Sequence, residues 1–412
     1  MGEEEAYEFV TSTLEKERIE PYTREESEVV HSVQQCINCG ICLSHCPVVA
    51  AVGIYRFSGP RSIAVELSRS PPEFWATGDT IYLCTGCGTC MEVCPKNVNI
   101  PEIVNMMRSR ILRFRPDLVP KGLHVVRETI LEHNLAFVPL EDVEDKTESR
   151  DMRLEHYGLP LIETPEEAKS EVLYYPGCQA EERSQEVREA AKIILDRFEV
   201  GFTMLEDMCC CGLPSRLMGD KDTAEKLASR LKQRIDELDI KKIVTTCAGC
   251  TSNIGDASFA YDWNVPVLHL VEFLTDEVGT DKLAKAFTKP RGKEKVKVTV
   301  HDPCHLIRHT SRQLMDKALL LLDLIPDVKV EVSTAADSCC GGGGLVAYHS
   351  KDVSKAVVKE NLEAIRLLEA QRVVTPCPLC TAQLEDNLFQ SGSSIEVDDL
   401  TVFIAQRLSN KG

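Results

Sequence analysis

The chain has 412 residues, of which 43% are hydrophobic, so it is long and apolar enough to form roughly two to four folded domains. Its 65 acidic and 47 basic residues give a net charge of −18, which argues against binding nucleic acid or an anionic lipid surface. The 19 cysteines stand in tight groups, an arrangement typical of metal sites rather than of a disulfide framework.

The beginning of the chain, residues 1–35, is charged and is interpreted as a lead-in to the first module. Its acidic start, Met1-Gly-Glu-Glu-Glu, is not a secretory signal, and no apolar run in the sequence is long enough to span a bilayer. Metal-binding thiolates need a reducing compartment, so we expect a cytoplasmic protein. If it works at the inner face of a membrane, a partner must hold it there.

Residues 36–115 contain the pattern C-x₂-C-x₂-C-x₃-C-P twice. In such a run, three thiolates hold one cluster and the fourth holds the other cluster of a pair. The sequence therefore predicts two cubane 4Fe–4S clusters, one held by Cys36, Cys39, Cys42 and Cys94, the other by Cys84, Cys87, Cys90 and Cys46. A pair of structural zinc sites is the alternative, but zinc sites generally use C-x₂-C pairs. Helical patterns over 58–67 and 101–112 make this module similar to the helical ferredoxin module of succinate dehydrogenase and fumarate reductase.

Residues 116–170 are predicted to be a weakly patterned connection, and an internal repeat follows, with a first lobe over 171–290 and a second lobe over 291–412. For the first lobe the sequence predicts strands at 171–175, 202–205 and 242–246 and helices at 182–198 and 222–238. For the second it predicts strands at 295–300, 328–332 and 372–375 and helices at 311–325 and 345–370. This alternation predicts a parallel sheet in each lobe, with cysteines at the carboxyl ends of the strands, where ligands gather.

Each lobe carries five cysteines in the pattern C-x₃₁₋₃₄-C-C-x₃₅₋₃₆-C-x₂-C. The first set is Cys178, Cys210, Cys211, Cys247 and Cys250, and the second is Cys304, Cys339, Cys340, Cys377 and Cys380. This pattern resembles the doubled CCG domain of the catalytic subunit of heterodisulfide reductase. Over residues 36–412 the order of modules resembles the form of that subunit in which the ferredoxin module and both CCG domains are joined in one chain. The resulting fold is α/β, with an N-terminal helical ferredoxin module and two pseudo-symmetric CCG lobes with parallel sheets.

The resemblance implies that each five-cysteine set holds a noncubane 4Fe–4S cluster and that these ten cysteines are catalytic. It also implies the substrate, the mixed disulfide of coenzyme M and coenzyme B. Two facing clusters would each take one sulfur of the disulfide and supply one electron. No flavin, haem or dinucleotide fingerprint is present, so electrons must come from a donor subunit. The resemblance implies that this donor subunit is a membrane b-type cytochrome or a soluble flavoprotein.

Two alternatives remain open at this point. The same layout occurs in iron–sulfur subunits of glycolate and lactate dehydrogenases, where the chain would only conduct electrons from a flavin subunit. Zinc in the C-x₂-C pairs is the other alternative.

Some residues near the cysteine sets also have an interpretation from sequence. Cys209 is interpreted as a packing cysteine, and Gly212 and Gly341 as positions where the backbone passes close to a cluster. The cations that we consider for binding an anionic substrate are Arg183, Arg216, His305, Arg308, His309 and Arg312.

Overall fold

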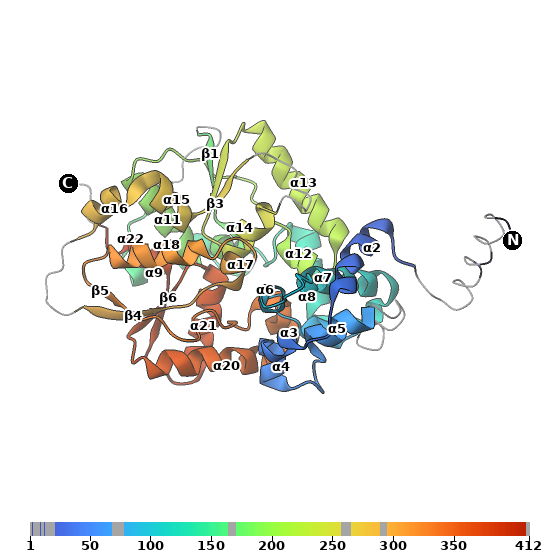
Figure 1. Ribbon diagram of the computed structural model, residues 1–412. Helices are drawn as coiled ribbons and strands as arrows, with labels where there is room; N and C mark the ends of the chain where they lie inside the picture. Colours follow the sequence, from blue (N-terminus) through green and yellow to red (C-terminus); the bar gives the residue numbers. More distant parts are fainter. Residues whose placement is uncertain are drawn as a thin grey trace.

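The computed structural model describes residues 21–67, 78–163, 170–256, 265–288 and 295–408, together with positions 2, 9 and 12. Most of the lead-in over residues 1–20 lies outside this part of the chain. A helical module, drawn in blue and cyan, lies beside two α/β lobes, drawn from green to red (Figure 1). The fold class predicted from the sequence is confirmed.

The N-terminal module consists of short helices around two cysteine loops. Gly40 and Gly88 occupy equivalent places in the two loops, each with a left-handed backbone (φ 80° and 76°) just before a short helix. Such a conformation favours glycine because it has no Cβ to clash. The elements are α2 (Arg24–His31), η1 (Ser32–Gln35), α3 (Ile41–Ser44), α4 (Pro47–Val52), α5 (Gly59–Leu67), η3 (Thr80–Leu83), α6 (Thr89–Glu92) and α7 (Ile100–Phe114).

The longest helix of this module, α7, joins it to the rest of the chain. Asn99 caps the helix by accepting a hydrogen bond from the Glu102 N–H at 3.2 Å. The fully buried Arg108 donates to the Cys84 and Leu217 carbonyls at 2.7 Å and to the Ile81 carbonyl at 3.0 Å. One guanidinium group therefore connects α7, the second cysteine loop and the first lobe.

The segment predicted to be a weakly patterned connection contains two full helices. They are α8 (Lys121–His133) and α9 (Lys146–Tyr157), with single turns η4 (Pro116–Leu118) and η5 (Leu140–Asp142). Asn134 ends α8 in the left-handed conformation, and its carbonyl accepts the Cys210 N–H at 2.8 Å. The segment thus helps to position a cysteine of the first lobe.

The first lobe is built on short strands that alternate with helices. Its elements are β1 (Val172–Tyr175), α10 (Gly177–Glu182), α11 (Gln185–Arg197), α12 (Leu213–Met218), α13 (Lys221–Glu237), β2 (Lys242–Thr245), α14 (Ala248–Ile254), β3 (Val267–His269), α15 (Leu270–Phe273), the π-helical turn η6 (Leu274–Gly279) and α16 (Thr280–Ala286).

The second lobe repeats this order. Its elements are β4 (Val296–Val300), α17 (Cys304–Ile307), α18 (Gln313–Asp323), β5 (Val328–Val330), η7 (Gly343–Leu345), α19 (Val346–His349), α20 (Lys351–Leu367), β6 (Arg372–Thr375), α21 (Pro378–Gln390), β7 (Glu396–Asp399) and α22 (Leu400–Ala405).

Both sheets are parallel, with the order β1-β2-β3 in the first lobe and β5-β4-β6-β7 in the second. The predicted strand at 202–205 is wrong, because within this stretch only Thr203 pairs with β1, through a single bridge at Leu173. That bridge occupies the place of β5, so the two sheets share one plan. The predicted helix at 345–370 is also wrong. Ser350 has a non-helical backbone (φ −141°, ψ 66°), and it separates α19 from α20.

The two lobes pack against each other reciprocally. The last helix of the second lobe, α22, contacts α11 of the first, and α15 near the end of the first lobe contacts α18 of the second (Figure 1). A continuous apolar core includes Val187 and Ile194 of one lobe and Leu321 and Phe403 of the other. The cysteine-bearing ends of both sheets are consequently held in a fixed relation.

Candidate functional site

The eight N-terminal cysteines line two neighbouring pockets. The first pocket, of about 410 Å³, is lined by Cys36, Cys39, Cys42, Cys90 and Cys94. The second, of about 380 Å³, is lined by Cys46, Cys84, Cys87 and Cys90. The last cysteine of each run thus lies in the pocket of the other run, as the crossed-over grouping requires, while Cys90 lines both pockets.

The chemistry of these pockets fits an iron–sulfur cofactor. Burial raises the pKa of the Cys84 thiol and raises that of Cys46 to about 12, so a buried thiolate needs a cation to stabilise it. Backbone N–H groups also point at the sulfurs, from Gly86 to Cys84 at 3.5 Å and from Val98 to Cys94 at 3.4 Å. The donor sets consist of thiols alone, as 4Fe–4S clusters require.

The two lobes enclose one shared cavity of about 940 Å³, including space that opens to solvent. Nine of the ten lobe cysteines line it: Cys178, Cys210, Cys211, Cys247, Cys250, Cys304, Cys340, Cys377 and Cys380. Cys339 is buried beside this wall and does not line the cavity, and neither does the extra Cys209. The topology thus brings the carboxyl ends of both sheets to a common space.

Equivalent contacts hold the cysteines in the two lobes. The Gly212 N–H points at Cys210 Sγ at 3.5 Å in the first lobe, and the Gly341 N–H points at Cys339 Sγ at 3.3 Å in the second. Thiol pairs also approach each other, with Cys178 and Cys210 sulfurs 3.8 Å apart. These clustered sulfurs are a donor set suited to iron.

The cavity wall is continuous across the lobes. The pKa of Cys247 is held well below its ordinary value by hydrogen bonds with Cys250 and with Cys377 of the second lobe. A thiol of one lobe therefore lies in contact with a thiol of the other, and a ligand in the cavity can reach both sets.

The second N-terminal pocket lies against the second lobe. After burial, the negative charge of Cys87 is among the causes that raise the pKa values of Cys304 and Cys339. His309 Nε2 is 2.9 Å from the Gly86 carbonyl, and His349 Nε2 is 3.1 Å from the Tyr82 carbonyl. The cysteine loops of the N-terminal module therefore lie directly beside the second cysteine set, which gives electrons a short path between them.

The glycines after the cysteine pairs are needed for close backbone packing. A Cβ on Gly343 would lie 2.4 Å from the Thr85 carbonyl oxygen, and one on Gly344 would lie 2.1 Å from that of Cys84. Gly212 and Gly341 have positive φ and approach backbone carbonyls of the helices that follow, those of Ala224 and Ser354. These glycines let backbone segments pack closely.

Several cations predicted to bind a substrate are paired with carboxylates instead. Arg308 and Arg312 both bind Glu92 of the N-terminal module, at 2.7 and 2.5 Å, and both also bind Asp337. Arg216 binds Glu102 and Asp256 at 3.0 and 2.7 Å. These ion pairs join residues far apart in the chain, so they could not be seen in the sequence pattern.

Two of the remaining candidates are close to the cavity. His305 lines it, with Nδ1 at 3.0 Å from Ser252 Oγ, its ring stacked on His309, and its pKa lowered by burial. Arg183 donates to the Val138 carbonyl at 3.0 Å and lies over the ring of Phe137, which lines the cavity. Arg183 is therefore at the rim.

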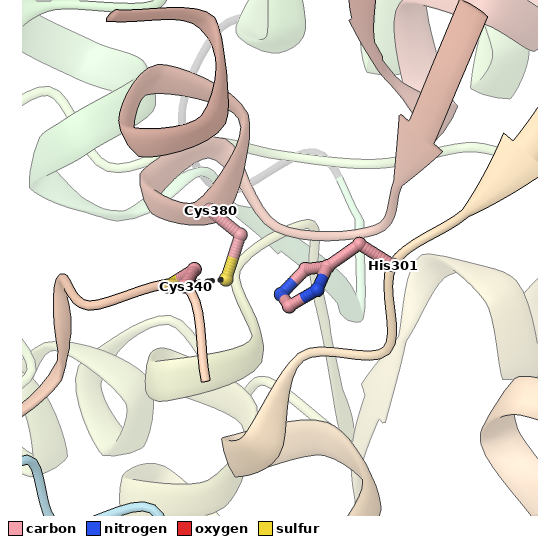
Figure 2. Close-up of side chains that lie close together, drawn as sticks. All are labelled: His301, Cys340 and Cys380. Carbon is pink, nitrogen blue, oxygen red and sulfur yellow. Dashed lines mark hydrogen bonds between the residues drawn. The ribbon is translucent and has the colours of Figure 1, made fainter. Parts of the chain in front are cut away.

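Sequence reasoning assigned no role to His301, which lies beside the second cysteine set. One nitrogen of its ring and the sulfurs of Cys340 and Cys380 all lie within 4.8 Å of one another (Figure 2). The signal was present in the stretch His301-Asp-Pro-Cys-His305, but its meaning depends on contacts from other elements.

Comparison with known protein families identifies the modules. Residues 172–255 and 298–385 each match the cysteine-rich (CCG) domain, and residues 32–98 match a 4Fe-4S dicluster domain. Along the described ranges, no helix combines the length and hydrophobicity needed to cross a bilayer.

Curated relatives match nearly the whole chain. A subunit of fumarate reductase (CoM/CoB) from Methanothermobacter marburgensis is 28% identical over 91% of this chain and 72% of its own length. A subunit of dihydromethanophenazine:CoB–CoM heterodisulfide reductase from Methanosarcina barkeri is 27% identical, covering 90% of this chain and 93% of its own. A probable glycolate oxidase iron-sulfur subunit from Bacillus subtilis is 23% identical, covering 88% and 90%.

Proposed function

We propose that this chain, an iron–sulfur subunit of the type found in heterodisulfide reductase and related oxidoreductases, reduces the mixed disulfide of coenzyme M and coenzyme B. The observation that carries the proposal is the single cavity lined by nine lobe cysteines. The clusters themselves take up part of this space. Because the cavity opens to solvent and is shared by both cysteine sets, a disulfide can enter it and place one sulfur against each set.

The proposed ligands are those expected from the cysteine spacing. One cubane cluster is held by Cys36, Cys39, Cys42 and Cys94, and the other by Cys46, Cys84, Cys87 and Cys90. Each lobe's five cysteines hold one noncubane cluster. When bound, these groups supply one-electron transfer, and reduction of one disulfide to two thiols consumes two electrons and two protons.

The residues around the cysteines shape the substrate site. Phe137, Leu213, Leu345, Tyr348 and Leu379 line the cavity and exclude water from the reacting sulfurs. Arg183 at the rim is placed to bind an anionic group of the substrate outside the apolar wall. A donor protein, either a membrane cytochrome b or a soluble flavoprotein, delivers electrons to the N-terminal module.

A second function is favoured by one observation. Among the described residues that line the cavity there is no lysine or arginine, although the proposed substrate is anionic. An electron-transferring subunit of a glycolate or D-lactate dehydrogenase needs no anion site in this cavity, and one relative carries a glycolate oxidase name.

Two measurements on the anaerobically reconstituted chain test the proposal. Four 4Fe–4S clusters require about sixteen iron atoms per chain. Reduced viologen should be oxidised when the coenzyme M–coenzyme B disulfide is added, and Arg183→Ala should raise KM about tenfold, the cost of a charge-assisted hydrogen bond, with little change in kcat. Full iron content without disulfide turnover, together with electron transfer from a 2-hydroxy-acid flavoprotein, would replace this function by the dehydrogenase one. An iron content near eight atoms per chain, with zinc present, would show that the two lobes hold no iron–sulfur clusters.

A further inference from the structure

The imidazole of His301 is buried at the wall of the second lobe's cysteine set. Its side chain is only 1% exposed, and its ring points toward the Cys340 and Cys380 sulfurs (Figure 2). Nδ1 lies 2.9 Å from Asn361 Nδ2, whereas Nε2 has no hydrogen-bond partner among the described residues. An unpaired polar atom at this depth is costly unless the cofactor's sulfurs supply the partner.

Asn361 determines which ring nitrogen of His301 carries the proton. Its amide nitrogen donates to the Ser338 carbonyl at 3.1 Å, and a carbonyl oxygen can only accept, so the orientation of this amide is fixed. The same amide nitrogen faces His301 Nδ1, which must therefore accept. The proton of the neutral imidazole is on Nε2, so this nitrogen is a hydrogen-bond donor with no lone pair for iron.

The first lobe has neither residue. Tyr175 stands three residues before Cys178, as His301 stands three before Cys304, and its hydroxyl donates to the Cys209 carbonyl at 2.6 Å. Helices α13 and α20 both have 17 residues, and the position of Asn361 in α20 corresponds to that of the buried Leu231 in α13. The ring N–H directed at cysteine sulfur is thus a feature of the second lobe.

We propose that, when Cys340 and Cys380 hold the cluster as thiolates, His301 donates its Nε2–H to these sulfurs, and that Asn361 is the positioning residue that holds this tautomer. A hydrogen bond to a ligand sulfur stabilises the more negative, reduced state of a cluster. The hydrogen bond from His301 therefore makes the second-lobe site easier to reduce than it would be without this side chain. This inference rests on the proposed presence of a cluster in each lobe.

The test is a redox titration of the reconstituted full-length chain, followed by electron paramagnetic resonance. The second-lobe signal is the one that Cys339→Ala removes. His301→Asn removes the donor near the sulfurs, and we expect reduction to become about tenfold less favourable, which is about 59 mV for one electron. His301→Gln places an amide N–H near the Nε2 position and should restore the midpoint. The matched control Tyr175→Phe, in the first lobe, should leave the second-lobe midpoint unchanged.

The outcomes are separable. A His301→Asn chain with wild-type iron content and an unchanged second-lobe midpoint would overturn the inference while leaving disulfide turnover intact. Loss of second-lobe iron in both His301→Asn and His301→Gln would also overturn it, because the ring would then be a ligand. If the wild-type chain has no signal that Cys339→Ala removes, the second lobe holds no cluster, and the proposed function fails together with the inference.

Discussion

The two lobes share one sheet plan and the same pattern of five cysteines, yet the surroundings of those cysteines differ. Behind the second set stand His301 and Asn361, where the first has Tyr175 and Leu231. After Gly212 the first lobe continues with Leu213, whereas glycines follow Gly341 in the second and pack on the N-terminal module. The repeat has duplicated a set of sulfur donors, but the electrostatics and the contacts to neighbours have become specific to each copy.

The largest effect should come from removing one sulfur from either lobe. Cys211→Ala in the first lobe and Cys339→Ala in the second should each lower disulfide turnover by more than about 100-fold. Mutating a residue that only supports a metal ligand already costs up to about 100-fold, and loss of a ligand should cost more. The reason is that each half of the disulfide needs its own site. Turnover with reduced viologen measures both variants under the same conditions.

Cys209→Ala is the matched control for these variants, since Cys209 is buried next to the first set without lining the cavity. It should keep turnover and the noncubane signal, while Cys210→Ala should lose both. Activity retained in Cys211→Ala or in Cys339→Ala would show that one lobe suffices.

The pH dependence of stability should differ in sign between the lobes. His269 and Asp399 cap equivalent helices, α15 and α22, by accepting backbone N–H groups. Burial lowers the pKa of His269 from 6.5 to about 4 and raises that of Asp399 from 3.8 to about 8. In both cases the neutral side chain is the form that the folded state prefers.

These shifts fix the pH windows. Folded Asp399 binds its proton more tightly than the unfolded chain does, so its contribution is present at low pH and is lost as pH rises from about 4 to about 8. Folded His269 binds its proton less tightly, so its contribution is lost as pH falls from about 6.5 to about 4. Each pH unit inside a window changes the free energy of unfolding by up to about 1.4 kcal/mol.

Asn at either position keeps the helix cap and removes the titration. Denaturant unfolding at several pH values should show that Asp399→Asn gains stability relative to wild type as pH rises from 5 to 8. His269→Asn should gain relative to wild type as pH falls from 6.5 to 5. If the free energy of unfolding changed with pH in parallel for wild type and Asp399→Asn, the Asp399 carboxyl would not be held neutral in the folded state.

A smaller effect should reveal how the second lobe contacts the cysteine loops. Gly343→Ala places a Cβ 2.4 Å from the Thr85 carbonyl oxygen and should cost about 1–3 kcal/mol of stability by overpacking. Gly201→Ala is the control, because its Cβ would meet only Ser170 Oγ at 3.8 Å, and it should stay within about 0.5 kcal/mol. Thermal unfolding compares the two variants, and equal losses would mean that the loop moves away freely.

The sequence predicted the features that depend on local spacing. A C-x₂-C-x₂-C loop brings its own thiols together, and the alternation of strands and helices indicated two parallel sheets. The edge strands β3 and β7 were missed because they are short, and β7 (Glu396–Asp399) is mostly acidic, a composition that disfavours strands.

The rest depends on residues far apart in the chain. Arg308 was interpreted as a substrate cation because its partner Glu92 is 216 positions away. His301 had no assigned role because its partner Asn361 lies 60 positions later, on another helix. Such contacts are decided by packing of whole elements, and no periodicity or spacing in the sequence encodes them.

The reciprocal packing of the lobes has a consequence for synthesis on the ribosome. Helix α11 ends at Arg197, but the helix α22 that contacts it begins only at Leu400. At roughly 5–20 residues per second, the ribosome needs about 10–40 s to make the intervening chain. During that time the apolar surface of α11 that includes Val187 and Ile194 is not yet packed against α22. We expect the nascent first lobe to depend on chaperones until the chain is nearly complete.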